Sequence, residues 1–278
     1  MKRLCLILFV LLLAAPAMAE EPLQLARMNP AMLGSGGGAT QKPYCLSSTT
    51  CTTGTPGNCD LICEDFEGST ECKSGYDSAC RLAWDVSAGS GQSIDFTTVH
   101  NGSFACTDKG TNAGMLTATS SGASCAIWKD LNDQNIMYGE FYFNINSITL
   151  ASGSSQDIFT IATGAVSDDT ATIQVYNKSG TLRLYLLCDA CAHGAFGSTA
   201  LSTGTWYRVQ WEADTTNDHF TVYLNGSKEA EITDYTSTKL PSGFYVGWTS
   251  YGTRQATAAV IQYDNISVSS VGLPGGCN

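Results

Sequence analysis

The stretch from Gly204 to Gly226 constrains the fold of this chain most, because it predicts two adjacent β-strands joined by a short polar turn. From Trp206 to Ala213, mostly polar residues alternate with apolar ones, which is the pattern of a strand with one apolar face. A second alternation runs from Phe220 to Asn225, and Asn225-Gly226 then supplies a tight turn, since both residues tolerate positive φ. Between the two alternations lies Asp214 to Asp218, which is rich in side chains that hydrogen-bond their own backbone in turns.

The rest of the chain repeats this pattern of short alternating segments separated by polar turns. The longest clean alternation runs from Tyr138 to Ile148, and no stretch shows a convincing helical period over three turns. Short strands at regular spacing favour a sandwich or a barrel over parallel βαβ units. Further strands are predicted at Leu61–Gly68, Ser93–Thr97, Met115–Thr119, Ala123–Lys129, Asp157–Thr163, Thr170–Asn177, Thr181–Cys188, Glu229–Thr233, Gly243–Ser250 and Thr257–Ser269.

Three sequence features resemble the laminin G-like jelly rolls of the concanavalin A-like lectin/glucanase superfamily. They are the hairpin W-Y-x-V-x-W-x-x-D followed by F-T-V-Y-L-N-G, the opening D-F-E-G at residues 65–68, and Trp84 soon after it. The resemblance covers roughly Leu61 to Ser270. It implies an all-β fold, a two-sheet antiparallel jelly-roll sandwich. Because the superfamily contains both binding modules and glycoside hydrolases, the fold leaves the activity open.

Four segments are expected along the chain. Residues 1–19 have the features of an export signal: a basic start, an apolar run from Leu4 to Ala15, and Ala17-Met-Ala19 as a cleavage site. Residues 20–60 form a flexible and Cys-rich extension, residues 61–270 the jelly roll, and residues 271–278 a tail. The apolar run of the signal is shorter than the about 20 residues that span a bilayer, and no later segment is long or apolar enough. We therefore expect a protein that is secreted or at the cell surface, without a membrane span.

The chain is acidic. Its formal net charge is −11, and loss of the signal removes two of the 14 basic and none of the 25 acidic residues, which leaves 12 against 25, or −13. Such a surface makes nucleic acid and anionic membranes unfavourable partners. It would also repel an acidic polysaccharide unless a local arginine or lysine site attracted that polymer.

Cysteine is abundant, with 12 residues in the whole chain and eleven after loss of the signal. In an exported protein this predicts disulfides. A zinc site at Cys59-x-x-x-Cys63 is the alternative, although no histidine is nearby. The odd count leaves one thiol over, and Cys277 in the Gly-rich tail is the expected one. The other ten are Cys45, Cys51, Cys59, Cys63, Cys72, Cys80, Cys106, Cys125, Cys188 and Cys191.

No complete catalytic motif is present. Retaining glucanases of this fold carry E-x-D-x-x-E on one strand, and the nearest match here, Glu212-Ala-Asp214-Thr-Thr-Asn217, ends in an asparagine that cannot act as the general acid. We interpret it as a turn with solvated carboxylates. Polysaccharide lyases need a Tyr or His base with Arg, Asn or Gln beside the uronate carboxylate. Candidates of these types are Arg183, Tyr185, His193, His219 and Arg254, none of which lies in the sequence blocks of the alginate lyases. We assign no catalytic residue.

Sugar binding would use aromatic side chains flanked by polar ones, because a pyranose ring has an apolar face and a rim of hydroxyl groups. Each such side chain could instead pack in the core or the sheet, and Trp248 in particular could be buried with Val246. Four of the candidates cluster in the segment G-W-T-S-Y-G-T-R-Q. The predicted ligand-binding residues are Tyr142, Tyr185, Arg183, Trp248, Tyr251, Arg254 and Gln255.

The resemblance also implies a structural calcium ion. In many carbohydrate-binding jelly rolls, an acid of the opening strand and an acid of the closing strand hold such an ion together with backbone carbonyls. Glu67 and Asp264 occupy similar places here, with Asp65 and Asn265 nearby. Calcium takes about six to eight oxygen ligands, so further donors would be needed. Alternatively, these acids are simply exposed beside turns.

These observations predict a secreted, non-catalytic carbohydrate-binding or surface-adhesion module whose partner is a polysaccharide or glycoconjugate. A polysaccharide lyase or glycoside hydrolase of the jelly-roll type is the first alternative. The second is a structural subunit of an extracellular filament or coat, which would self-associate through the Cys-rich extension and the odd cysteine.

Overall fold

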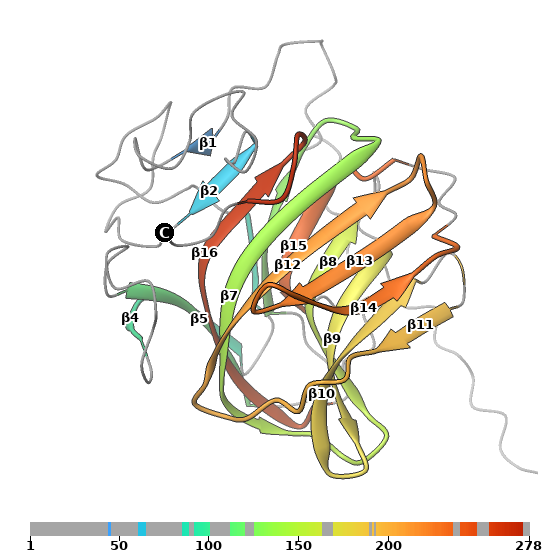
Figure 1. Cartoon of the computed structure of the whole chain (residues 1–278). Coiled ribbons are helices and arrows are strands. Elements are labelled where there is room, and N and C mark those ends of the chain that lie inside the picture. The colour runs from blue at the N-terminus through green and yellow to red at the C-terminus, as the bar shows by residue number, and fades with distance from the viewer. Residues whose placement is uncertain are drawn as a thin grey trace, which may run out of the picture. The chain divides into compact units, whose positions relative to one another are not determined.

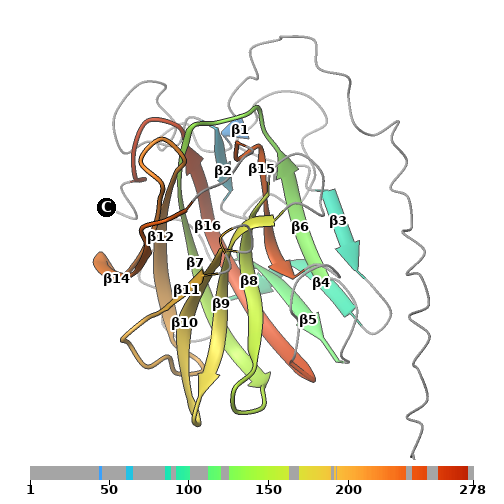
Figure 2. The same ribbon diagram turned by 90° about the vertical axis from the view of Figure 1, so that its right-hand side faces the viewer.

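The computed structural model describes residues 44–45, 61–64, 85–88, 92–100, 112–119, 125–162, 169–188, 191, 193–235, 240–248 and 256–274. All of these residues belong to the unit that runs from Gln41 to Asn278. Every regular element in them is a β-strand, and the strands form two sheets (Figures 1 and 2). The predicted all-β sandwich is therefore confirmed. The described residues contain no long apolar helix of the kind that crosses a membrane.

The larger sheet has nine strands, and its main path runs in the order β1-β2-β16-β7-β12-β13-β14, while β5 pairs with β16 and with β4. All its pairs are antiparallel except β1 with β2. The strands are β1 (Tyr44–Cys45), β2 (Ile62–Glu64), β4 (Gln92–Val99), β5 (Asn112–Ala118), β7 (Ile136–Thr149), β12 (Trp206–Asp214), β13 (His219–Leu224), β14 (Ser227–Ile232) and β16 (Ala258–Ser269).

The smaller sheet has seven strands in the order β11-β10-β9-β8-β15-β6-β3, all antiparallel. Its strands are β3 (Asp85–Ala88), β6 (Cys125–Asp130), β8 (Ser155–Ala162), β9 (Asp169–Lys178), β10 (Thr181–Cys188), β11 (His193–Phe196) and β15 (Gly243–Trp248). The short edge strand β11 was not predicted, because His193-Gly-Ala-Phe196 has too few apolar residues to show an alternation.

The hairpin that the sequence predicts most clearly is present as β12 and β13, with Trp211 opposite Val222. Its turn is closed by Asp214, whose Oδ1 accepts hydrogen bonds from the backbone N–H groups of Thr216 and Asn217 at 2.8 and 3.0 Å. The next turn, into β14, places Asn225 and Gly226 at φ values of 51° and 82°. Both turns therefore use the residue chemistry that the sequence suggested.

The two sheets pack through a core that is rich in aromatic side chains. Phe159 of the smaller sheet stacks on Phe141 of the larger one with ring centroids 5.0 Å apart, and it contacts Trp211 at 5.2 Å. Tyr263 crosses the same space, and its hydroxyl donates a hydrogen bond to the Ile158 carbonyl oxygen at 3.1 Å. Gly139 lies beneath the Trp211 indole, where a Cβ atom would come within 2.2 Å of the ring. Only glycine fits at that position.

Candidate functional site

The side of the nine-stranded sheet that points away from the core carries several charged side chains, among them Glu140, Arg208 and Asp264. This surface follows from the alternation of side chains along a strand. Val209 and Trp211 of β12 are buried in the core, so Arg208 and Gln210 project from the opposite side. Cross-strand partners share a side of the sheet, which extends this surface over β7, β13 and β16. We call it the polar face, and it comprises Tyr138, Glu140, Tyr142, Asn144, Trp206, Arg208, Gln210, Glu212, Asp214, His219, Thr221, Tyr223, Gln262 and Asp264.

An ion pair between Arg208 and Glu140 lies near the centre of the polar face. Glu140 Oε2 accepts from Arg208 Nε at 2.8 Å and from Nη2 at 2.7 Å. The Glu140 side chain is 4% exposed and that of Arg208 is 24% exposed. Burial raises the pKa of Glu140 to about 7, although Arg208 and Gln210 both act to lower it. The carboxylate of Glu140 is thus costly to keep charged at neutral pH, and Arg208 is the group that compensates for it.

Arg208 and Gln210 of β12 also donate hydrogen bonds to the backbone of Pro274. The carbonyl oxygen of Pro274 accepts from Gln210 Nε2 at 2.7 Å and from Arg208 Nη2 at 3.3 Å. Pro274 is buried. We call residues 270–274 the C-terminal segment. Because β7 lies between β16 and β12 in the sheet, this segment has to cross β7 after β16 ends in order to reach Arg208 and Gln210 (Figure 1).

The β16 side of the polar face is a buried network around Asp264. Its Oδ2 lies 2.8 Å from Nε2 of His100, and its Oδ1 accepts from the Asn265 backbone N–H at 2.7 Å. The Asp264 side chain is fully buried and that of His100 is 9% exposed. His100 also meets Trp206 edge to face, with ring centroids 5.2 Å apart. Sequence reasoning missed His100 because it lies 164 positions from Asp264 and belongs to no motif.

This arrangement bears on the predicted calcium ion. A histidine ring and a backbone N–H engage the two oxygens of Asp264, whereas calcium needs several free oxygen ligands. The other predicted ligand, Glu67, lies outside the described residues, and so does Asp65. A calcium site of Glu67 and Asp264 stays a prediction.

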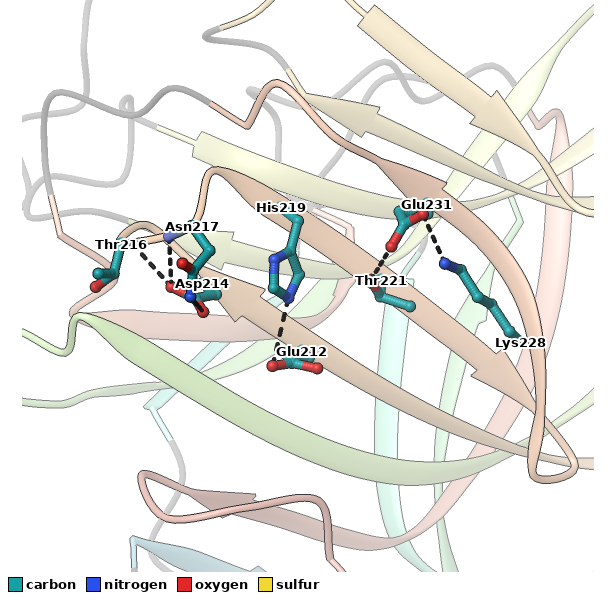
Figure 3. A network of polar contacts seen from close by, with 8 residues as sticks. All are labelled: Glu212, Asp214, Thr216, Asn217, His219, Thr221, Lys228 and Glu231. Atoms are coloured by element: carbon teal, nitrogen blue, oxygen red, sulfur yellow. Dashed lines mark hydrogen bonds and ion pairs between the residues drawn. The ribbon is translucent and has the colours of Figure 1, made fainter.

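A second group of polar residues lies at the turn between β12 and β13 (Figure 3). One donor atom each from Glu212, Asp214 and His219 lie within 4.8 Å of one another, close enough to hold a metal ion. Glu212 Oε1 is 3.4 Å from His219 Nε2. The pKa of Tyr138 is raised by partial burial and by the negative charges of the two acids. This end of the polar face therefore has a negative electrostatic potential, which favours binding of a cation over an anion.

Asp214 corrects one detail of the sequence interpretation. The segment is a turn, as expected, but the carboxylate of Asp214 is not solvated, since the residue is only 2% exposed. Its Oδ2 accepts from Asn217 Nδ2 at 2.7 Å, in addition to the two backbone bonds at Oδ1. Burial raises the pKa of Asp214, but these hydrogen bonds outweigh it and lower the pKa below the usual value. The side chain is an anion that closes the turn.

The polar face continues onto β14 with a smaller network (Figure 3). Glu231 accepts from Thr221 Oγ1 at 3.2 Å and pairs with Lys228 at 2.6 Å. The Lys228 side chain is 51% exposed, so this pair is open to solvent and screened by salt. It contrasts with the Arg208–Glu140 pair, which is mostly buried.

The structure does not bring the predicted ligand-binding residues together. Tyr142 lies on the polar face directly opposite Arg208 and is 7% exposed. Arg183 and Tyr185 lie on β10, in the other sheet, where the Arg183 guanidinium donates to the Ser198 carbonyl oxygen. Trp248 is fully buried in the core together with Val246, the alternative that the sequence left open. The remaining three, Tyr251, Arg254 and Gln255, lie outside the described residues.

Three of the cysteines that we expected in disulfides have side chains that the structure describes. Cys188 and Cys191 form a disulfide with Cα atoms 5.3 Å apart, which is a local loop bridge. Cys125 is instead a buried thiol whose Sγ lies 3.5 Å from the Ser93 carbonyl oxygen, and this differs from the prediction. The side chains of the other predicted disulfide residues lie outside the described part: Cys45, Cys51, Cys59, Cys63, Cys72, Cys80 and Cys106.

Comparison with known proteins gives likeness in structure only. No protein-family model matches the sequence, and no curated protein matches it. Among solved structures, "Cellulose induced protein, Cip1" is similar with a TM-score of 0.51 and 15% identity, over 77% of this chain and 100% of that one. The globular domain of T. cruzi calreticulin gives a TM-score of 0.48 and 8% identity, over 75% and 87% of the two chains. AlyA1, a PL7 alginate lyase from Zobellia galactanivorans, gives 0.45 and 13%, over 67% and 94%.

At such low identities the likeness concerns the fold alone. The two sheets, their antiparallel pairing and the aromatic core between them are the features of the jelly-roll sandwich that the sequence resemblance implied. The chain therefore has the fold of a jelly-roll sandwich.

Proposed function

We propose that this protein is a secreted carbohydrate-binding module that takes a polysaccharide or glycoconjugate on the polar face of its nine-stranded sheet. One observation carries the proposal: Arg208, Gln210 and Trp206 project side by side from β12 with Tyr142 opposite them. Guanidinium and amide groups match the hydroxyl rim of a sugar, and an aromatic ring matches its apolar face. The sites predicted at Arg183 and Tyr185 lie on the other sheet and are not needed.

The proposal replaces a dispersed set of predicted residues with a contiguous one. Of the residues that the sequence singled out, Tyr142 stays in the site. Arg208, Gln210 and Trp206 join it because they share its side of the sheet. The Cys188–Cys191 disulfide supports export, since disulfides persist in oxidising compartments.

Affinity electrophoresis tests the proposal. The mature protein is run through native gels that contain neutral or acidic polysaccharides, with and without calcium, and the gels are stained for polymer. Retardation in at least one gel, without loss of the polymer, is expected. Retardation that depends on calcium would support an ion at Glu67 and Asp264. Retardation that is the same without calcium would show that carbohydrate binding does not require the ion. Unretarded migration in every gel would contradict the proposal.

A matched pair of variants assigns the binding to the polar face. Arg208→Lys keeps a positive charge beside Glu140 but loses the planar fork of donors, so we expect weaker retardation and little loss of fold. Arg183→Lys makes the same change on the smaller sheet and should leave retardation unchanged. Equal effects from the two variants would move the site away from the polar face.

A polysaccharide lyase is a second candidate, and one observation favours it. Tyr142 and Arg208 are direct cross-strand partners, and His100 reaches the same face at Asp264. A lyase needs such a set: a base takes the proton next to the uronate carboxylate, a cation stabilises the resulting anion, and the glycosidic oxygen leaves as a double bond forms. Ultraviolet absorbance of the unsaturated product, assayed on acidic polysaccharides, distinguishes this reaction from binding alone.

A further inference from the structure

The Pro274 carbonyl oxygen occupies a position between two hydrogen-bond donors on the polar face. Gln210 Nε2 donates to it at 2.7 Å and Arg208 Nη2 at 3.3 Å. Gln210 is 8% exposed and Pro274 is buried, so this oxygen is held away from bulk water. An amide and a guanidinium that converge on one oxygen form a site that fits a carboxylate at least as well as a carbonyl, because hydrogen bonds to an anion are stronger.

The guanidinium has capacity for a second oxygen. Glu140 accepts from Nε and Nη2 of Arg208, and Pro274 accepts from Nη2. An arginine carries five N–H bonds, and in the described part of the chain nothing accepts from Nη1. A carboxylate in place of the carbonyl could therefore receive hydrogen bonds at both oxygens, from Arg208 and from Gln210.

The C-terminal segment must turn away from β16 to bring the Pro274 carbonyl to β12. The segment follows β16 and crosses β7 to reach β12, where Gln210 and Arg208 donate hydrogen bonds to the Pro274 carbonyl oxygen. In the sheet register, Glu140 of β7 lies between Ser267 of β16 and Gln210 of β12. The Pro274 carbonyl thus accepts from N–H groups of Arg208 and Gln210 that would otherwise be open to a ligand.

We propose that Arg208 and Gln210 form a carboxylate-binding subsite for a hexuronate unit of an acidic polysaccharide, and that the Pro274 carbonyl occupies this subsite until the ligand displaces the C-terminal segment. The inference rests on the proposed carbohydrate-binding function and adds to it the class of sugar and a competitor within the chain. It also explains how an acidic protein could hold an acidic polymer, because the contact is a local arginine site. Binding to the open subsite is reduced by the fraction of molecules in which the segment occupies it.

Three chain lengths test the competition. The mature chain keeps the carbonyl at Pro274. A chain that ends at Pro274 places a terminal carboxylate there, which should occupy the subsite more tightly. A chain that ends at Ser270 removes the competitor. The probe is a defined oligosaccharide of glucuronic acid, with the matched oligosaccharide of glucose as the neutral control, and affinity is measured by titration calorimetry.

The expected order of affinity for the glucuronate probe is distinctive. The chain ending at Ser270 binds about tenfold more tightly than the mature chain, and the chain ending at Pro274 binds about tenfold more weakly. Gln210→Met removes one donor and should reduce the differences among the three lengths. Lys228→Met removes a cation from the same face outside the subsite and should leave them unchanged. Thermal unfolding of each chain confirms that it is folded.

The outcomes separate this inference from the proposed function. Equal glucuronate affinity in all three lengths, or absent glucuronate binding in the chain ending at Ser270, would overturn the inference. Retained binding of a neutral polysaccharide would then leave the carbohydrate-binding function standing. Loss of binding to every polysaccharide in every chain would remove both.

Discussion

The two sheets present chemically different surfaces on their outward sides. The polar face of the nine-stranded sheet holds the Arg208–Glu140 ion pair and the Asp264–His100 contact, both mostly buried. The outward side of the seven-stranded sheet, which we call the aromatic face, carries more rings, together with a buried Asp157 whose Oδ1 accepts from Gln174 Nε2 at 2.7 Å. Tyr185 and Phe196 lie 4.5 Å apart between centroids. The aromatic face is defined by Trp128, Tyr176, Tyr185, Phe196 and Tyr245.

The difference shows what each surface contributes. Rings on the aromatic face pack on each other, and Lys178 Nζ lies 4.3 Å from the centroid of Phe196. Such contacts tolerate change, since their energy is spread over many atoms. On the polar face, charges are buried against specific partners, so removal of one partner leaves the other charge uncompensated. Function and pH dependence should therefore concentrate on the polar face.

Replacement of one arginine on each face should give the largest difference in unfolding free energy between the two faces. Arg208→Met leaves Glu140 buried without its cation and should lower the free energy of unfolding by about 3 to 5 kcal/mol at mildly alkaline pH. Arg183→Met removes a partly exposed arginine that donates to a carbonyl, and about 1 kcal/mol or less is expected. Urea unfolding of both variants measures this. Equal losses would show that the two faces are energetically alike.

The pH dependence of stability should come from Glu140. Its folded pKa of about 7 lies above the usual 4.5, so the folded state binds more protons between these values, and stability falls as pH rises through that window. The shift corresponds to a loss of about 3 kcal/mol between the two ends of the window. Glu140→Gln should flatten this part of the profile. A profile of the variant that still falls between pH 4.5 and 7 would assign the dependence to another group.

Asp214 offers a test of the turn at the electronegative end of the polar face. Asp214→Ala removes three hydrogen bonds to Thr216 and Asn217 and should cost about 2 kcal/mol in unfolding free energy. Asp218→Ala, in the same turn but exposed, is the control for acid removal, although its φ of 55° adds a smaller strain of its own. Thermal unfolding compares the two. A greater loss from Asp218→Ala would mean that Asp214 does not hold the turn.

The aromatic residues of the two faces should differ in ligand binding more than in stability. Trp206→Ala on the polar face should weaken polysaccharide binding by about fivefold, which is the typical worth of one aromatic contact. Phe196→Ala on the aromatic face, where the ring is 41% exposed, should leave binding unchanged. Titration with the polysaccharide that retards the protein gives both values. A larger effect from Phe196→Ala would place the ligand on the aromatic face.

Local sequence patterns predicted much of the fold because alternation acts over a few residues. Strand β12 and its turn follow from Trp206 to Asp218 alone, and the core positions of β7 follow from its alternating phenylalanines. The same reasoning placed both Tyr142 and Trp248 among the ligand-binding candidates, although Tyr142 lies on the polar face and Trp248 is buried in the core, a burial that the sequence had left open. Which side of a strand faces the core depends on the sheet packed against it, and periodicity does not identify that sheet.

The sequence by itself determined that this chain forms short strands with one apolar side, joined by turns of Asn, Asp and Gly, because those preferences are set by neighbouring residues. Tertiary structure decided the composition of the polar face. Arg208 meets Glu140 across 68 positions, and Asp264 meets His100 across 164. Only sheet pairing brings such residues within hydrogen-bond distance, and only the path of the C-terminal segment places the Pro274 carbonyl against Arg208 and Gln210. These contacts depend on the whole fold, since no short stretch of the chain contains both partners.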